Sequence, residues 1–194
     1  MFGNIFNKKN ILVTGHTGFK GSWLCLWLEA LGAKITGLAL PPATDPNLFE
    51  ISEIGSRMDS RIVDLRDAEA VKNVMTAADP EFVFHLGAQA IVRTSYDQPL
   101  ETFQTNVLGT ADVLEAARGQ DRLRALVVIT SDKVYLPATE PRVEDSLLGG
   151  RDPYSASKAA AEMATNAWRA SFPQSARIAT ARAGNVVGGG DWAA

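Results

Sequence analysis

Two side chains four residues apart, Tyr154 and Lys158, carry the clearest chemistry in the sequence. They fall near the start of a predicted helix, since Asp152 is a good N-cap residue and Pro153 a good first residue. Residues i and i+4 share a helix face, so we expect the ammonium to lie close to the phenol and to stabilise its ionised form. Such a tyrosine can accept the proton of an alcohol while hydride leaves the same carbon. The spacing also fits an exposed Tyr–Lys pair with no chemical role.

A second polar group, Ser131, Asp132 and Lys133, directly follows Arg124 to Thr130, the strongest strand signal in the chain. Doubly wound sheets bind ligands at the carboxyl ends of their strands, so we expect this group near Tyr154. Ser131 can then hydrogen-bond the same substrate hydroxyl as the tyrosine, and Asp132 and Lys133 offer an acid and a base. For the last two, a solvated turn is the alternative interpretation.

A glycine-rich turn separates the first predicted strand from the first predicted helix. It reads Gly15-His16-Thr17-Gly18-Phe19-Lys20-Gly21. Small residues let the backbone N–H groups approach a pyrophosphate, which the positive end of the helix also attracts. A tight turn without a ligand is the alternative, but its position in a strand–helix–strand unit favours dinucleotide binding. After the second predicted strand, Ala39-Leu40-Pro41-Pro42 offers neither an acid nor an arginine for the ribose, and Asp45 comes late, so NAD and NADP both remain open.

The elements that must position these groups alternate regularly between strand and helix. The predicted strands are Ile11–Thr14, Lys34–Leu40, Arg61–Asp64, Glu81–Leu86, Arg124–Thr130 and Arg177–Arg182, and the predicted helices are Gly21–Leu31, Asp67–Ala78, Pro99–Arg118 and Pro153–Ser171. This alternation predicts an α/β fold of the Rossmann type: a doubly wound parallel sheet with helices on both faces.

Composition excludes several classes of protein. The 194 residues carry a net charge of −3, which argues against a nucleic-acid partner, and one cysteine, Cys25, rules out an internal disulfide and a cysteine-based zinc site. The longest apolar run is Ala125 to Ile129, so no membrane span is expected, and Met1 to Asn10 shows no secretory signal. A cytoplasmic protein is the default expectation. No metal is expected either: His85 sits in a strand as a structural residue, whereas His16 can touch the cofactor.

Over essentially its whole length, the chain resembles the extended short-chain dehydrogenase/reductase family, and within it the subfamily of dehydratases that act on CDP-glucose. The matching segments are Thr14-Gly15-His16-Thr17-Gly18-Phe19-Lys20-Gly21-Ser22-Trp23-Leu24, Ser131-Asp132-Lys133, Asp152-Pro153-Tyr154-Ser155 and Arg182-Ala183-Gly184-Asn185-Val186-Val187-Gly188-Gly189-Gly190-Asp191-Trp192. Nucleotide-sugar 4,6-dehydratases more often carry Glu where this chain has Lys133, and the lysine is similar to the CDP-glucose subfamily.

The resemblance implies a role for each candidate residue, with NAD as cofactor and a nucleotide sugar, CDP-glucose, as substrate. Tyr154 would be the base for oxidation at sugar C4, with Lys158 on the nicotinamide ribose and Ser131 orienting the C4 hydroxyl. Lys133 would remove the C5 proton, for which it must be neutral, and Asp132 would protonate the departing C6 hydroxyl. The implied cofactor residues beyond the turn are Asp64, Leu65, Leu86 and Ala88, and the implied sugar-facing residues are Gln89, Arg93 and Asn185.

The resemblance also implies a division of the chain and a dimer. Residues 1–185 would form the NAD-binding Rossmann domain, and 186–194 would begin a substrate-binding domain that is largely absent. Two long helices, Pro99–Arg118 and Pro153–Ser171, would pack against a second copy to form a homodimer. Two alternatives remain: a nucleotide-sugar epimerase or reductase of the same fold, which has no use for an Asp132–Lys133 pair, and a non-catalytic dinucleotide-sensing protein.

Overall fold

The computed structural model describes residues 2–172 and 176–193; Met1, residues 173–175 and Ala194, which fall within the predicted domain ranges, lie outside the described residues. Six parallel strands form one sheet in the order β3-β2-β1-β4-β5-β6. They span β1 Asn10–Thr14, β2 Lys34–Ala39, β3 Asp59–Ile62, β4 Phe82–His85, β5 Ala125–Ser131 and β6 Arg177–Ala183. This order is that of the doubly wound Rossmann fold, which confirms the predicted fold class.

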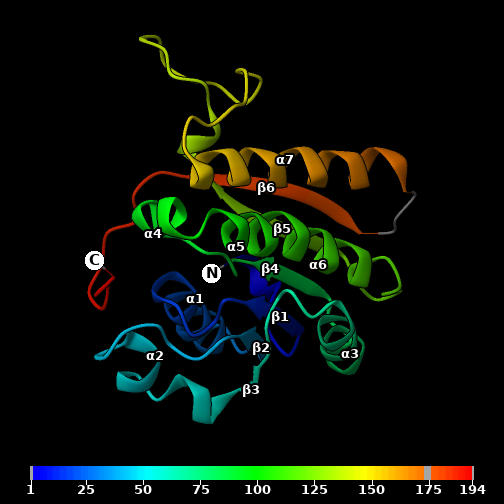
Figure 1. Ribbon diagram of the computed structural model, residues 1–194. Helices are drawn as coiled ribbons and strands as arrows, with labels where there is room; N and C mark the ends of the chain where they lie inside the picture. The colour runs from blue at the N-terminus through cyan, green and yellow to red at the C-terminus, as the bar shows by residue number, and fades with distance from the viewer. Residues whose placement is uncertain (1, 173–175, 194) are drawn as a thin grey trace.

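Helices cover both faces of this sheet (Figure 1). They are α1 Phe19–Ala30, α2 Leu48–Ile51, α3 Ala68–Ala78, α4 Val92–Asp97, α5 Pro99–Phe103, α6 Gly109–Ala117 and α7 Pro153–Ser171. Alternate residues of a strand face opposite sides, and β1 shows the result clearly. Ile11 and Val13 pack with Cys25 of α1, whereas Leu12 packs with Met75 of α3 and the buried face of α6. The strand-helix alternation in the sequence therefore produces two cores, one on each face.

Several predicted boundaries were wrong. The third strand runs over Asp59–Ile62 instead of Arg61–Asp64. It lies at the edge of the sheet, where polar residues such as Asp59 and Ser60 can pair with β2 just as apolar residues can. The predicted helix Pro99–Arg118 is helical throughout but contains a π-helical turn at Gln104–Leu108 between α5 and α6. The short helices α2 and α4 were not predicted, because each offers too few turns for a periodic pattern.

The direction of winding reverses between β1 and β4, which are neighbours in the sheet. Doubly wound sheets bind ligands in the crevice at this point, beside the carboxyl ends of the strands. The glycine-rich turn after β1, the loop after β4 and the Ser131 group at the end of β5 all reach this edge. Within residues 2–172 and 176–193, no helix combines the length and apolar character that crossing a bilayer requires.

Candidate active site

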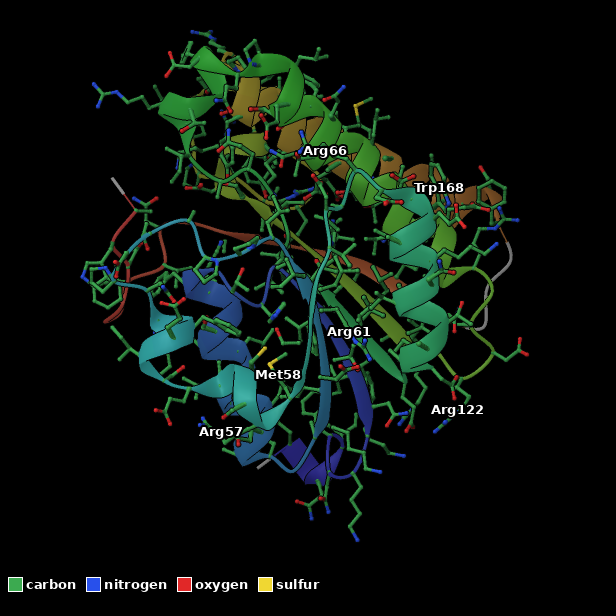
Figure 2. The ribbon with its side chains drawn as sticks, turned by 60° about the horizontal axis from the view of Figure 1, so that its bottom comes forward. Arg57, Met58, Arg61, Arg66, Arg122 and Trp168 are labelled. Carbon is green, nitrogen blue, oxygen red and sulfur yellow. The ribbon has the colours of Figure 1, made fainter. Side chains whose placement is uncertain are left out.

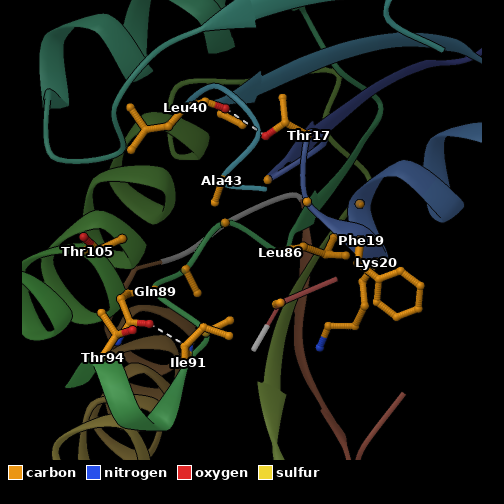
Figure 3. Close-up of a pocket in the computed structure, with 18 of the residues that line it drawn as sticks. Thr17, Phe19, Lys20, Leu40, Ala43, Leu86, Gln89, Ile91, Thr94 and Thr105 are labelled. Carbon is orange, nitrogen blue, oxygen red and sulfur yellow. Dashed lines mark hydrogen bonds between the residues drawn. The ribbon is translucent and has the colours of Figure 1, made fainter. Parts of the chain in front are cut away.

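A cavity of about 730 Å³ lies along this edge of the sheet. One wall holds Thr17, Phe19 and Lys20 of the glycine-rich turn and its helix, and the facing wall holds Gln89, Ile91 and Thr94 of the loop after β4 and the start of α4 (Figure 3). Ser131, Lys133 and Tyr154 line the same space. Its volume falls in the range of ordinary ligand sites, and the phosphate-type turn and the acid–base residues therefore share one cavity.

The glycine-rich turn is built for close backbone approach. Gly15 has φ +74°, and a Cβ on Gly21 would lie 2.0 Å from the Gly15 carbonyl oxygen, so both positions require glycine. No acidic side chain occupies the first turn of α1, and the Gly18 N-cap brings no side chain to its free amides. The Thr17 hydroxyl donates to the Leu40 carbonyl at 2.8 Å and ties the turn to the end of β2. These features fit a bound pyrophosphate.

Gly21→Ala should destabilise the turn by roughly 1–3 kcal/mol, because the added methyl meets backbone atoms and no flexible side chain. We also expect weaker dinucleotide binding, since the turn must open to relieve the contact. Thermal unfolding and cofactor titration measure the two effects. Gly119→Ala is the matched control, since a Cβ there meets nothing within 4 Å. Equal stability and equal cofactor affinity in the two variants would contradict this view of the turn.

The acid–base residues gather at the other end of the cavity. Ser131 is 5% exposed; its hydroxyl donates to Asp132 Oδ1 at 3.1 Å and accepts the Lys133 backbone N–H at 3.2 Å. Lys133 is partly exposed, and its Nζ lies 3.5 Å from Asn185 Oδ1 and 4.0 Å from Asp132 Oδ1. Tyr154 is the second residue of α7; its side chain lines the cavity, and its backbone N–H donates to the Ser95 hydroxyl at 3.1 Å. A serine, a lysine and a tyrosine thus line this part of the cavity, with the Asp132 carboxylate next to the lysine.

One electrostatic expectation is wrong. Burial raises the pKa of Tyr154, the hydrogen bond with Ser131 opposes this only in part, and the nearby carboxylates Asp132 and Asp152 raise it further. Lys158 is not among the groups that shift the phenol pKa, and its Nζ donates to the Ile129 carbonyl at 3.4 Å. Lys158 is 8% exposed and lies behind the cavity wall.

Lys158→Met should stabilise the protein near pH 7. Burial, helped by the charge of Lys20, lowers the pKa of Lys158 from 10.5 to about 8. The folded state thus disfavours the ammonium, so Lys158 opposes folding below pH 8, and this opposition fades as pH rises from about 8 to 10.5. The gain from Lys158→Met is at most about 3 kcal/mol near neutrality, and the rise in stability across that alkaline window should disappear.

Urea unfolding at a series of pH values tests this prediction, with Lys72→Met on the exposed side of α3 as the control. A Lys158→Met protein that is less stable than the parent at pH 7 would contradict it. Activity should fall in the same variant, so the two readouts should move in opposite directions.

The structure brings most of the other predicted residues to the cavity. Asp64, Leu65, Leu86, Ala88, Gln89 and Asn185 line it, together with every residue of the glycine-rich turn except His16. Hydrogen bonds from Arg66 lower the pKa of Asp64, and the Gln89 amide is held by Thr102 and by the Ile91 backbone. Figure 2 shows Arg66 on the connection between β3 and α3. Asp132 and Arg93 are exposed outside the lining.

The two histidines are both internal. His16 is fully buried; its Nε2 lies 2.7 Å from the Ser60 hydroxyl, so its ring points away from the cavity and only its backbone can face a cofactor. His85 bridges Thr14 and Thr110 at 2.6 and 2.9 Å, as expected of a structural residue. Among the described residues, no group of three or more His, Cys, Asp or Glu side chains could hold a metal ion.

Sequence reasoning missed Asn106, which sits in the π-helical turn and is 1% exposed. Its amide accepts the Gln89 N–H at 2.8 Å and donates to the Gln89 carbonyl at 3.0 Å and to the Ser157 hydroxyl at 2.8 Å. Ser157 in turn donates to the Tyr154 carbonyl at 2.7 Å. Asn106 thus joins the loop after β4 to the start of α7. A buried polar stripe at spacing four, which includes Thr102 and Thr110, is the signal that could have found it.

Comparisons with known proteins agree with this geometry. Residues 11–193 match the family described as the NAD dependent epimerase/dehydratase family. A CDP-glucose 4,6-dehydratase of Salmonella typhimurium is 47% identical over 98% of this chain and 55% of its own length. A UDP-glucose 4-epimerase of Mycolicibacterium smegmatis is 34% identical over 81% of this chain and 50% of its own. The chain therefore spans about half the length of the curated relatives it matches.

A solved structure shares the fold as well. A UDP-glucose 4-epimerase of Stenotrophomonas maltophila, described with bound NAD and formylated UDP-arabinopyranose, superposes with a TM-score of 0.78 at 28% identity. The match covers 90% of this chain and 52% of that one. The chain therefore resembles these proteins both in sequence and in fold.

Proposed function

The chain belongs to the NAD dependent epimerase/dehydratase family, and from this premise we propose that the full-length protein is a CDP-glucose 4,6-dehydratase. It would convert CDP-glucose into CDP-4-keto-6-deoxyglucose and water with NAD as its cofactor. The observation that carries the proposal is Lys133 beside Asp132 at the mouth of the cavity that Tyr154 lines. An epimerase has no step for such an acid–base pair, whereas a dehydratase requires one.

The glycine-rich turn and the amino end of α1 would hold the pyrophosphate of NAD. Asp64 and Leu65 would face the adenine, Leu86 and Ala88 would line the dinucleotide, and Lys158 would contact the nicotinamide ribose. When bound, NAD would supply the hydride acceptor for sugar C4 and the hydride donor for C6, so no external reductant would be consumed. The open turn, with no acidic side chain near its amides, fits this cofactor.

The side chains then divide the proton transfers among them. Tyr154 accepts the proton of the C4 hydroxyl, which Ser131 orients by a hydrogen bond, and C4 becomes a ketone. The ketone makes the C5 hydrogen acidic, so Lys133 can remove it as a proton. Asp132 protonates the C6 hydroxyl, which leaves as water as the C5–C6 double bond forms. Lys133 returns its proton to C5 when C6 is reduced. The proton that Tyr154 accepted is released to solvent and Asp132 regains one from solvent, so each group is restored and the sum is loss of one water.

Incubation of the full-length protein with NAD and CDP-glucose tests the proposal. We expect a product that is lighter than the substrate by one water and that carries a ketone at C4 and a methyl at C6. A product of unchanged mass, inverted at C4, would identify an epimerase, and ligand binding without turnover would identify a sensing protein. Parallel reactions with dTDP-, GDP- and UDP-glucose, and with NADP, establish the preferred base and cofactor.

We also propose that the protein forms a homodimer through the α5–α6 segment and α7. These helices lie side by side (Figure 1). They expose Leu100 at 71%, Leu108 at 60% and Met163 at 65%. Light scattering should report a dimer, and Leu108→Glu should weaken it. Leu147→Glu is the control, because Leu147 is exposed on a loop away from these helices, and it should leave the dimer unchanged. A parent protein that remains a monomer would contradict this. We propose in addition that the protein is located in the cytoplasm.

A further inference from the structure

A buried ion pair lies directly behind the acid–base residues. Glu162 of α7 is 1% exposed, and Arg182 of β6 donates to both of its carboxylate oxygens, from Nε at 2.9 Å and from Nη2 at 3.0 Å. The hydroxyls of Thr130 and Thr180 complete the set, at 2.6 and 2.8 Å. Burial raises the pKa of Glu162, but the four hydrogen bonds together outweigh it and bring the pKa below its ordinary value. Glu162 is therefore a fully paired carboxylate.

The partners of Glu162 are neighbours of the catalytic candidates along the chain. Thr130 immediately precedes Ser131 on β5, and Glu162 lies two helical turns after Tyr154, on the same face as Lys158. The pair therefore joins α7, which carries the phenol, to the strand that ends in the acid–base group. Among the described residues, charged side chains connect α7 to β5 and β6 in two places. One is the Glu162 group, and the other is the hydrogen bond from Lys158 to the Ile129 carbonyl.

Arg182 also reaches forward to the segment between Lys133 and Tyr154. Its Nη1 donates to the Tyr135 hydroxyl at 2.9 Å and to the Glu144 carbonyl at 2.8 Å, and the guanidinium lies 4.9 Å from the Tyr135 ring centre. Tyr135 is two residues from Lys133. A single arginine thus ties β6, α7 and this connecting segment together.

We propose that Glu162 and Arg182 form a positioning pair that sets α7 against β5, so that the Tyr154 phenol meets the hydroxyl that Ser131 orients. This inference rests on the proposed function. A buried ion pair is weak support for stability, because desolvation offsets much of its attraction, whereas its two-pronged geometry fixes direction and distance. Misplacement of a reacting group by about 1 Å can cost on the order of 10²-fold in rate.

Glu162→Gln/Arg182→Met in the full-length protein separates positioning from folding. The double variant removes both charges together, so no buried charge is left unpaired, and glutamine still accepts from a threonine. We expect the thermal unfolding temperature to change little, kcat to fall roughly 10²-fold, and KM for CDP-glucose to stay within about threefold. Substrate contacts are left intact, so the loss should appear in kcat alone.

The matched control is Lys9→Met/Glu81→Gln. Glu81 is 9% exposed and pairs with Lys9 at 2.9 Å, at the opposite end of the sheet, where Arg122 also lies (Figure 2). Glu81 pairs with Lys9 and Arg122, and none of these three residues lies in α7, so kcat should be unchanged. A parent enzyme with no dehydratase activity would refute the proposed function itself, whereas an active parent and an equally active Glu162→Gln/Arg182→Met variant would overturn the positioning role alone.

Arg182→Lys covers the case in which the double variant does not fold. It retains the charge, but an ammonium cannot repeat the planar fork that grips both carboxylate oxygens. We expect kcat to fall at least severalfold with KM nearly constant. A folded Arg182→Lys protein with the parent kcat would overturn the proposal as well.

Discussion

Tyr154→Phe in the full-length protein should lower dehydratase kcat by roughly 10²- to 10⁴-fold, the usual contribution of a positioned general base. The phenol lines the cavity beside Ser131 and is 8% exposed, and phenylalanine keeps its ring packing while it removes the proton acceptor. Oxidation at C4 should slow in the same proportion, so mass spectrometry should show much slower formation of the 4-keto-6-deoxy product and no accumulation of a 4-keto hexose.

Two controls accompany this variant. Tyr96→Phe changes an exposed phenol on α4 and should leave kcat unchanged, and thermal unfolding should show that Tyr154→Phe is folded. In the parent, burial and nearby carboxylates raise the pKa of Tyr154, so the rate should increase toward alkaline pH, and Tyr154→Phe should lose that dependence. Normal turnover by Tyr154→Phe would show that the Tyr154–Lys158 pair has no chemical role.

Lys133→Met should block the loss of water and leave oxidation at C4 possible. Its Nζ lies beside Asp132 and Asn185, whereas Ser131 and Tyr154 remain in place in the variant. We expect product formation to fall by roughly 10²- to 10⁴-fold. A sugar nucleotide that has lost two hydrogens but no water should accumulate in an amount comparable to that of the enzyme.

This variant distinguishes the two halves of the proposed reaction. In deuterium oxide, the parent should introduce deuterium at C5, and Lys133→Met should not, because no base removes the C5 proton. Lys72→Met is the control for loss of a lysine charge elsewhere. If Lys133→Met forms the dehydrated product at the parent rate, Lys133 is not the base.

Much of the fold was accessible from the sequence because local signals and tertiary structure agree there. Asp152 caps α7 through the Ser155 N–H at 2.9 Å, and α7 spans Pro153–Ser171 as predicted. Gly32, at φ +80°, follows the end of α1 in the expected manner. The buried strands β1, β4 and β5 are rich in apolar and β-branched residues, which is what periodicity detects.

The missed features depend on tertiary contacts. Hydrogen bonding to β2 places β3 at Asp59–Ile62, and the polar residues of this edge strand give no hydrophobic pattern from which the pairing could be predicted. The π-helical turn depends on Asn106 reaching both Gln89 and Ser157. The spacing of Tyr154 and Lys158 suggests an ion-stabilised phenolate, yet the Lys158 Nζ donates to the backbone carbonyl of Ile129. Spacing along a helix predicts a shared face, but it does not predict which partner a long side chain chooses.

The most direct test of the proposed chemistry follows one hydrogen atom. CDP-glucose that carries deuterium at C4 is incubated with the full-length protein and NAD, and the product is analysed by NMR. Transfer within one active site predicts that the deuterium appears in the C6 methyl group of the 4-keto product. Deuterium that remains at C4 of an epimerised sugar, or that is lost to solvent, would contradict the proposed dehydratase chemistry.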